Sequence, residues 1–254
     1  MDQSALNYEM IPKKTIERKG SQKVPVMTKG GEKKRATILS LINSTGEKYK
    51  QFIIVKGVHN AQVHEAMQQS NDESTQFSAQ ENAWTDQKQL ESWLESVWWP
   101  IARSTEEPKL LVLDSYPLHK TLQNEFAKYN TIVKFIPTGL TGVLQPLDGL
   151  YHKSYKKFAK DFFLYNQNKT IKNEEEWRAL LVSCVKEVYS KMSHETILKS
   201  WKAVGLENPN SELIPFVNED SMIVEVDNTF VRENGSMLIE MDNTLVKDER
   251  SMII

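Results

Sequence analysis

The chain of 254 residues has almost no cysteine, since Cys184 is the only one, and no disulfide can form within the chain. This composition favours a protein of the cytosol or nucleus. No apolar run approaches the roughly 18 residues that a membrane span needs. The first residues, Met1–Ser4, have neither the basic nor the apolar region of a secretory signal. We therefore expect an intracellular protein with no membrane partner.

Charge is unevenly distributed, although the formal net charge is only −2. Residues 205–254 hold 11 acidic and 3 basic side chains, whereas residues 1–204 hold 23 acidic and 29 basic ones. The body therefore carries +6 and the tail −8. A mildly basic body is compatible with nucleic-acid binding, but it is weak evidence, because most lysines on soluble proteins are simply solvated.

The tail contains a repeat of 15 residues, in which Ser221–Gly235 is echoed by Ser236–Arg250 and a third copy begins at Ser251. Two full copies are too few for a self-supporting solenoid. We predict an acidic, weakly strand-forming tail without a catalytic role.

The remaining pattern predicts an α/β domain with a mixed sheet. A turn at Asn43–Glu47 joins two strand-like runs into a hairpin. Residues 59–83 are polar and predict a loop, and Thr85 is a plausible N-cap for a helix whose tryptophans belong to the core. The predicted strands are 36–42, 49–55, 110–113 and 131–136, with an edge strand at 24–27; the predicted helices begin at 85 and span 119–129, 148–165, 174–192 and 194–203.

Three aspartates lie at positions where side chains could form a functional site. Asp114 ends a buried strand, Asp148 opens a helix after a loop rich in Pro and Gly, and Asp2 lies near the N-terminus. Clustered carboxylates repel one another unless cations neutralise them, and oxygen ligands suit Mg²⁺ or Mn²⁺. Two such ions can promote phosphodiester cleavage. By themselves the positions are weak evidence for a site, because an N-cap at Asp148 and a loop entry at Asp114 also explain them.

Two segments resemble motifs of the DDE superfamily endonucleases, in the pogo/jerky-like branch of the mariner transposases. Leu111–Asp114, followed by His119, resembles the second-aspartate motif, and Val133–Asp148, which ends in Leu-Gln-Pro-Leu-Asp, resembles the third. Weaker likenesses extend the resemblance over roughly residues 1–165. They are the first-aspartate region at Met1–Leu6, the hairpin residues Arg35, Ala36, Thr37 and Gly46, the tryptophans Trp84 and Trp93 with Leu94, and Lys153, Lys156 and Lys157.

The resemblance implies an RNase H-like fold, a mixed sheet flanked by helices, that cleaves and transfers DNA strands with two Mg²⁺ or Mn²⁺ ions. Asp2, Asp114 and Asp148 would be the catalytic metal ligands, with His119 and Gln145 as accessory residues. Packing explains His119 about as well. Lys153, Lys156, Lys157 and Lys160 would contact DNA phosphates, unless they only form a solvated helix face. DNA is the implied partner and the nucleus the implied location; no small-molecule substrate is implied, and a homodimer is left open.

The expected organisation is a DDE endonuclease core at 1–165, helices packing on it at 166–205 and the acidic tail at 206–254. Only Met1 precedes Asp2, so we expect the first strand to be truncated, and helix-turn-helix modules typical of the family are not found. The hypotheses are therefore a DNA endonuclease or transposase domain, and a catalytically inactive transposon remnant or domesticated nuclear nucleic-acid-binding protein. A nuclease acting on RNA is a third, supported by the fold class alone.

Overall fold

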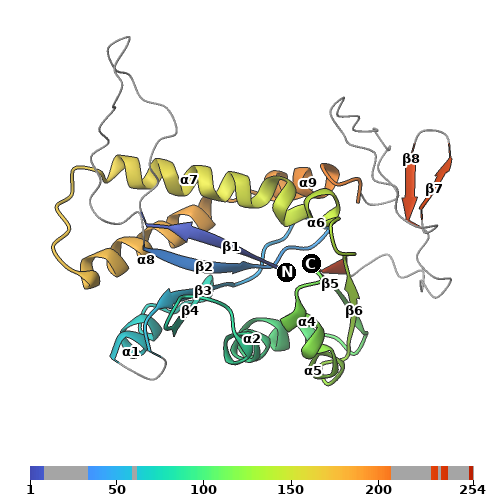
Figure 1. Cartoon of the computed structure of the whole chain (residues 1–254), viewed down its shortest axis with the longest axis horizontal. Helices are drawn as coiled ribbons and strands as arrows, with labels where there is room; N and C mark the ends of the chain where they lie inside the picture. Colours follow the sequence, from blue (N-terminus) through green and yellow to red (C-terminus); the bar gives the residue numbers. More distant parts are fainter. Residues whose placement is uncertain (9–33, 59–61, 207–229, 234–235, 240–251, 254) are drawn as a thin grey trace, which may run out of the picture.

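The structure, a computed structural model, describes residues 1–8, 34–58, 62–206, 230–233, 236–239 and 252–253 (Figure 1). The edge strand predicted at 24–27 and most of the tail repeat lie outside these residues. The mixed α/β architecture that the sequence predicts is confirmed, with mixed strands flanked by helices in an RNase H-like arrangement.

The larger sheet has the strand order β1-β2-β3-β4. The three strands β1, β2 and β3 are antiparallel neighbours, as the predicted hairpin requires, and β4 runs parallel to β3. Gly46 makes the hairpin turn with a positive φ of 90°, a backbone region that favours glycine. The bounds are β1 (Asp2–Asn7), β2 (Arg35–Ser40), β3 (Gln51–Lys56) and β4 (Thr75–Gln80).

The second sheet is centred on β5, which pairs in parallel with β6 on one side and with β9 on the other. Met1 connects the two sheets, because its amino nitrogen donates a hydrogen bond to the carbonyl of Val112 at 3.2 Å. The first residue of β1, Asp2, therefore lies beside β5. The bounds are β5 (Lys109–Leu113), β6 (Thr131–Phe135) and β9 (Met252–Ile253); a separate pair, β7 (Phe230–Glu233) and β8 (Ser236–Ile239), is antiparallel.

Helices lie on both sides of the strands, with α7, α8 and α9 on one side and α2, α4 and α5 on the other (Figure 1). None of the helices within the described residues is both long and apolar enough to cross a membrane. The helical bounds are α1 (Gln62–Gln68), α2 (Gln87–Trp93), η1 (Leu94–Trp98), α3 (Trp99–Ala102), α4 (Pro117–Thr121), α5 (Gln123–Ala127), α6 (Thr141–Leu144), η2 (Leu147–Tyr151), α7 (His152–Tyr165), α8 (Glu174–Lys191) and α9 (His194–Lys202).

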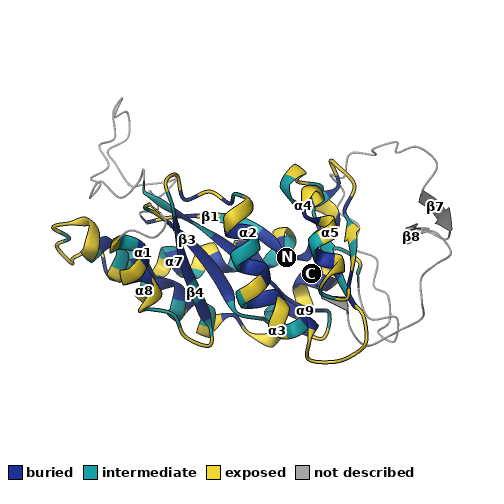
Figure 2. Cartoon of the chain, turned by 90° about the horizontal axis from the view of Figure 1, so that it is seen from below, coloured by how far each residue is buried: buried dark blue, intermediate teal, exposed yellow. Residues whose placement is uncertain are grey.

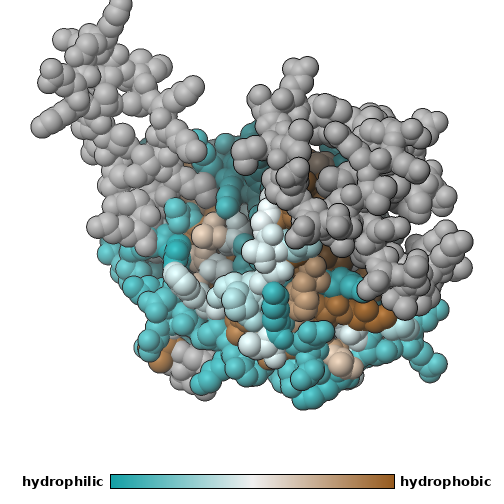
Figure 3. All heavy atoms as spheres, turned by 45° about the vertical axis from the view of Figure 1, so that its right-hand side comes forward, coloured by the Kyte–Doolittle hydropathy of each residue, from teal (hydrophilic) through white to brown (hydrophobic). Residues whose placement is uncertain are grey.

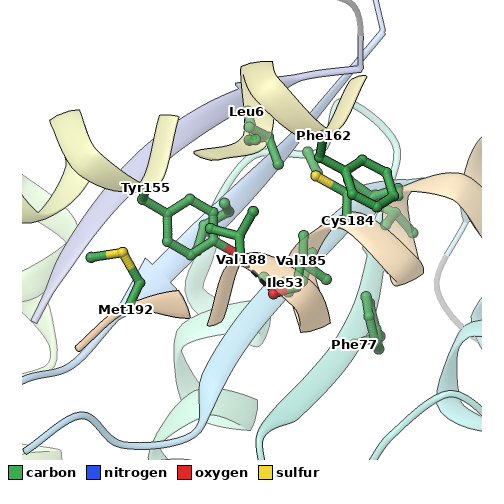
Figure 4. Packing of buried hydrophobic residues seen from close by; sticks show 14 of the residues in the cluster. Leu6, Ile53, Phe77, Tyr155, Phe162, Cys184, Val185, Val188 and Met192 are labelled. Carbon is green, nitrogen blue, oxygen red and sulfur yellow. Dashed lines mark hydrogen bonds between the residues drawn. The ribbon is translucent and has the colours of Figure 1, made fainter. Parts of the chain in front are cut away.

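The strand β3 is buried on both faces, and its alternating side chains enter two different cores. Ile53 and Val55 pack against Tyr155 of α7 and Val185 of α8 (Figure 4), whereas Phe52 and Ile54 pack toward the other side. Because β-strand side chains alternate between faces, a continuous apolar run is expected for a strand covered on both sides. Figure 2 shows the resulting pattern, with buried strands in the middle and exposed outer helical surfaces.

The second core is built around the tryptophans of α2 and η1. Trp93 and Trp98 are fully buried and stacked, with ring centroids 6.3 Å apart, and Leu111 and Leu113 of β5 belong to the same cluster. The prediction that these tryptophans form core rather than a base-stacking platform is confirmed. Met1 is also in this cluster, so the same packing supports the strands that carry Asp2 and Asp114.

Two local predictions were wrong. The polar segment 59–83 contains α1 and the mostly buried strand β4, because Phe77 and Ala79 reach the core once β4 pairs with β3. The N-cap of α2 is Asp86 instead of Thr85, since the Asp86 side chain accepts a hydrogen bond from the backbone nitrogen of Gln89. Asp is a favourable N-cap, and its carboxylate reaches the third helical residue.

The described surface is mixed in polarity. On the face drawn in Figure 3, hydrophilic residues prevail along the lower rim, and hydrophobic residues gather in one area toward the right. The exposed large hydrophobic residues of the described part include Ile132 of β6 and Val143 of α6.

We predict that Asp72→Asn destabilises the fold modestly at neutral pH. Asp72 accepts hydrogen bonds from Ser74 and Thr75, and its other oxygen lies 2.7 Å from Nζ of Lys186, which ties the turn before β4 to α8. Burial raises the pKa of Asp72, but the bonds from Lys186 and Ser74 outweigh it and hold the pKa at about 2. The side chain is 40% exposed, so solvent screening limits the expected loss to about 1 kcal/mol.

The sign of the pH dependence follows from this lowered pKa. The stabilisation is present above the usual carboxyl value of 3.8 and is lost as the pH falls toward about 2. Urea unfolding at several pH values should therefore show wild type and Asp72→Asn converging in acid. Glu73→Gln, a neighbouring exposed carboxylate, is the control; an equal loss in both variants would contradict the assigned contacts.

Candidate active site

Two of the three predicted aspartates meet a buried histidine. Asp2 at the start of β1, Asp148 in η2 and His152 at the start of α7 each offer a ligand atom, and these atoms lie within 4.8 Å of one another. Nδ1 of His152 is 3.2 Å from Oδ2 of Asp2 and 3.6 Å from Oδ1 of Asp148. Asp2 is buried, whereas the side chain of Asp148 is 40% exposed, so the group is open to solvent on the Asp148 side.

The histidine is nearly surrounded by protein, yet neither of its ring nitrogens makes an aligned hydrogen bond to any residue that the structure describes, and the same is true of Oδ2 of Asp2. His152 is 4% exposed. Burial lowers the pKa of His152, but the carboxylates of Asp148 and Asp2 outweigh this effect and raise it. His152 in turn lowers the pKa of Asp148. Buried polar atoms normally have partners, so this arrangement is suited to a bound cation.

The local fold explains how Asp148 reaches this position. The turn η2 packs on α9 at Gly149, where a Cβ atom would lie 3.3 Å from the side chain of Val204. A larger residue at position 149 would therefore require the side chain of Val204, which follows α9, to shift by a few tenths of an ångström. The capping residue of η2 is Pro146, so Asp148 lies inside the first turn and the alternative reading of Asp148 as an N-cap is wrong.

Asp114 contacts a different histidine, His119. Nδ1 of His119, in α4, lies 2.6 Å from Oδ1 of Asp114, and Nε2 of His119 lies 3.1 Å from the amide nitrogen of Gln3 in β1. The amide nitrogen can only donate, so Nε2 accepts and Nδ1 donates to Asp114. Burial raises the pKa of Asp114, but the hydrogen bond that His119 donates outweighs this effect and lowers the pKa below its usual value. His119 is fully buried and orients Asp114.

The α-amino group of Met1 lies between the two parts of the site. It is fully buried, and burial lowers its pKa to about 4, while the charges of Asp2 and Asp114 oppose this shift. Asp2 and Asp114 thus both influence the pKa of the Met1 amino group. The cluster of ligand atoms within 4.8 Å comprises Asp2, Asp148 and His152, and Asp114 is not part of it.

The predicted accessory and DNA-binding residues are placed as follows. Gln145 is fully buried; its carbonyl accepts hydrogen bonds from the backbone nitrogens of Asp148 and Gly149, and its side-chain amide has no partner among the described residues. On α7, opposite the buried Tyr155, Ala159 and Phe162, lie the lysines Lys153, Lys156 and Lys157, which are exposed, and Lys160, which is half-buried. Lys156 is close enough to the site to lower the pKa of Asp148.

Sequence reasoning missed His152. The signal was present, since a residue four positions after Asp148 on a helix lies on the same face. In the sequence, His152 is a single histidine among lysines and aromatic residues, and this pattern indicates no function. Only the structure shows that Asp2 lies beside it.

The comparison with protein families covers most of the chain: residues 33–208 match the family described as DDE superfamily endonuclease. The chain belongs to the DDE superfamily endonucleases. Asp114 and Asp148 lie inside the matched region of this DDE domain, and Asp2 precedes it. The resemblance inferred from the two aspartate motifs is confirmed.

Two curated relatives of the DDE domain are named "Pogo transposable element with KRAB domain". The chain is 27% identical to the one from Homo sapiens and 26% identical to the one from Mus musculus, in each case over 157 residues. The match covers 60% of this chain and 24% of each relative, so the chain matches about a quarter of the length of these relatives. No solved structure matches.

Proposed function

We propose that this DDE domain is a metal-dependent DNA endonuclease of the transposase type, which cleaves and transfers DNA strands in the nucleus. The observation that carries the proposal is the meeting of Asp2 and Asp148, which are 146 positions apart, in one group of ligand atoms within 4.8 Å. Asp114 ends the adjacent strand β5. The family membership supports a phosphodiester as the substrate.

The residues present fit a divalent cation. Within the described part of the chain, a buried carboxylate oxygen of Asp2 and the two ring nitrogens of His152 make no aligned hydrogen bond, and the carboxylate of Asp148 is accessible from solvent. Asp2 and Asp148 would hold one Mg²⁺ or Mn²⁺ ion, and Asp114 would serve a second. When bound, such ions stabilise the negative charge that develops on phosphodiester oxygens during cleavage.

The protein side chains would orient the site and the DNA. His119 holds Asp114 in place through its 2.6 Å contact, and Gln3 fixes the ring from the other side. The exposed lysines of α7, with Lys160, would contact backbone phosphates, and Lys156 is the lysine whose charge reaches Asp148. Binding that depends on such contacts weakens as salt rises, because counterions are released from DNA.

The test is Mn²⁺ binding by calorimetry to the purified chain and to the double variant Asp114→Asn/Asp148→Asn. We expect binding to the wild type and a loss of roughly 100-fold or more in the double variant, because removing carboxylate ligands removes both donors and charge. His152→Asn should weaken Mn²⁺ binding more than Mg²⁺ binding, since imidazole is a better ligand for Mn²⁺ than for Mg²⁺.

Asp161→Asn, an exposed carboxylate of α7, is the matched control and should bind as the wild type does. If the folded wild type binds no Mn²⁺, the metal-dependent proposal fails. The hypothesis of a catalytically inactive, transposon-derived nucleic-acid-binding protein would then be favoured.

A further inference from the structure

A groove to which no sequence motif gives a function lies next to the aspartates. A hollow of about 180 Å³ has Gln3, Arg35, Thr37, Trp84 and Tyr116 among its lining residues. A second hollow of about 410 Å³ is lined by Arg35, Lys56, Asn82 and Trp84. Because Arg35 and Trp84 line both, the two hollows adjoin and form one groove, here called the Trp84 groove.

An exposed indole ring lies in the groove. Trp84 is 56% exposed, and the guanidinium of Arg35 lies 5.0 Å from its ring centroid. Trp93 and Trp98, by contrast, are fully buried. An exposed tryptophan that stacks with arginine beside a basic groove provides the platform on which unpaired bases stack.

The backbone of the loop that carries Trp84 is fixed by hydrogen bonds. Oε1 of Gln80 accepts hydrogen bonds from the backbone nitrogens of Asn82 and Trp84, at 2.7 and 3.0 Å. The hydroxyl of Thr37 donates to the carbonyl of Ala83 at 2.6 Å, and Ala83 has a positive φ of 55°. A non-glycine residue in this conformation persists only where its surroundings enforce it. The exposed indole is therefore held in place by its neighbours.

The groove is complementary to a nucleic-acid strand in charge. Among the described residues, the side chains that line it include the cations Arg35 and Lys56 and no carboxylate. Tyr116, 41% exposed, adds a second aromatic ring near the other end. Cations for the backbone and rings for the bases are the usual combination in sites for single strands.

The groove also reaches the candidate active site. Gln3 lines it and directly follows Asp2, and Tyr116 lines it two residues after Asp114. The ring of Tyr116 contacts that of His119, with centroids 5.6 Å apart, and His119 holds Asp114. A strand whose phosphate lies at Asp114 can therefore extend toward the groove.

We infer that the Trp84 groove binds an unpaired nucleotide of the DNA strand adjacent to the scissile phosphate, with its base stacked on Trp84 and its backbone neutralised by Arg35 and Lys56. This inference rests on the proposed function for the identity of the polymer. The site distinguishes unpaired from paired DNA, because a base inside a duplex cannot offer its face to the indole.

The test measures the Kd of the full chain by fluorescence anisotropy for three labelled probes: a short oligothymidylate, a blunt duplex of equal length and the same duplex with a single-stranded overhang. Trp84→Ala should raise the Kd for the oligothymidylate and the overhang by roughly tenfold, the usual effect of losing one stacked base. The Kd for the blunt duplex should change less than about twofold. Trp84→Phe, which keeps a ring, should retain most of the affinity.

Trp99→Ala is the matched control, because Trp99 is also exposed, at 37%, and also lies near an arginine, Arg103, but lines neither hollow. The Trp99→Ala substitution should alter none of the Kd values for the three DNA probes. An unchanged affinity of Trp84→Ala for the unpaired probes, or an equal loss for the blunt duplex, would overturn the inference. Tighter wild-type binding of an oligouridylate than of the oligothymidylate would overturn the assignment to DNA.

The outcomes separate this inference from the proposed function. If the wild type binds the blunt duplex and Mn²⁺ but Trp84→Ala behaves as wild type on every probe, the groove assignment alone fails. If the wild type binds none of the DNA probes, the proposed function fails and the groove assignment fails with it. Trp84→Ala should leave Mn²⁺ binding unchanged, since Trp84 is not among the metal-ligating candidates.

Discussion

Replacing Asp114 with asparagine is expected to abolish Mg²⁺- or Mn²⁺-dependent cleavage of DNA and to leave the fold intact. The two side chains have the same shape, and the asparagine carbonyl can still accept the hydrogen bond that His119 donates to Asp114. What is lost is the negative charge at the end of β5. Metal ions contribute several kcal/mol to phosphoryl chemistry and each ~1.4 kcal/mol is tenfold in rate, so the rate should fall roughly 1000-fold or more.

The measurement is nicking of supercoiled DNA with Mg²⁺ or Mn²⁺, together with circular dichroism to compare the folds. Asp161→Asn removes one exposed negative charge from α7 and should cleave at the wild-type rate. Undiminished Mg²⁺-dependent nicking by Asp114→Asn would show that Asp114 is not a ligand and that the site has been assigned wrongly.

The largest effect on stability is expected from Trp98→Ala. Trp98 is fully buried, stacks on Trp93 and donates a hydrogen bond from Nε1 to the hydroxyl of Thr131 at 2.8 Å, which fastens η1 to β6. Large-to-small changes at such sites cost about 3–5 kcal/mol, through lost transfer energy and the cavity that remains. Domains of this kind are stable by only ~5–15 kcal/mol, so a large part of the stability would be lost.

Urea unfolding followed by circular dichroism should show a lower midpoint for Trp98→Ala. Trp98→Phe should lose less, about 1–2 kcal/mol, because a ring remains and the hydroxyl of Thr131 keeps its bond to the carbonyl of Tyr129. The exposed Trp99 pairs edge-on with Tyr129, so Trp99→Ala should cost about 1 kcal/mol. Equal losses in Trp98→Ala and Trp99→Ala would contradict the assignment of Trp98 to the core.

A consequence for the site follows from the same core. Met1, Leu111 and Leu113 pack in the cluster that contains Trp98, and they flank Asp2 and Asp114 in sequence. Loosening this cluster should therefore weaken metal binding as well as stability. The separation between Asp2 and β5 is set by a hydrogen bond, from Met1 to Val112, together with this packing.

Local sequence patterns determined much of the architecture. The run Leu110–Leu113 ending on Asp114 predicted β5, because a continuous apolar run suits a strand covered on both faces. Helical spacing placed α7, α8 and α9 to within a few residues, since each has one apolar face. The motif around Asp148 was specific enough to identify the family, which the match over residues 33–208 bears out.

Other features depended on contacts that no local pattern encodes. The strand β4 was predicted as loop, because only Phe77 and Ala79 are apolar in a polar segment and their burial requires pairing with β3. The exposure of Trp84 could not be predicted either, because the sequence contains six tryptophans and no local pattern shows which of them is exposed. Whether a ring enters the core or faces solvent is decided by the backbone that carries it.

The sequence by itself determined most of the elements, which aspartates end or open them, and which family they belong to, because periodicity and motif spacing are local. Only the tertiary structure decided that Asp2 and Asp148 share a group with His152, that Asp114 is held by His119, and that Trp84 and Arg35 line a groove beside them. These arrangements join residues from β1, β2, α4, η2 and α7 with the segment that follows β5, and such contacts exist only after the strands pair and the helices pack on them.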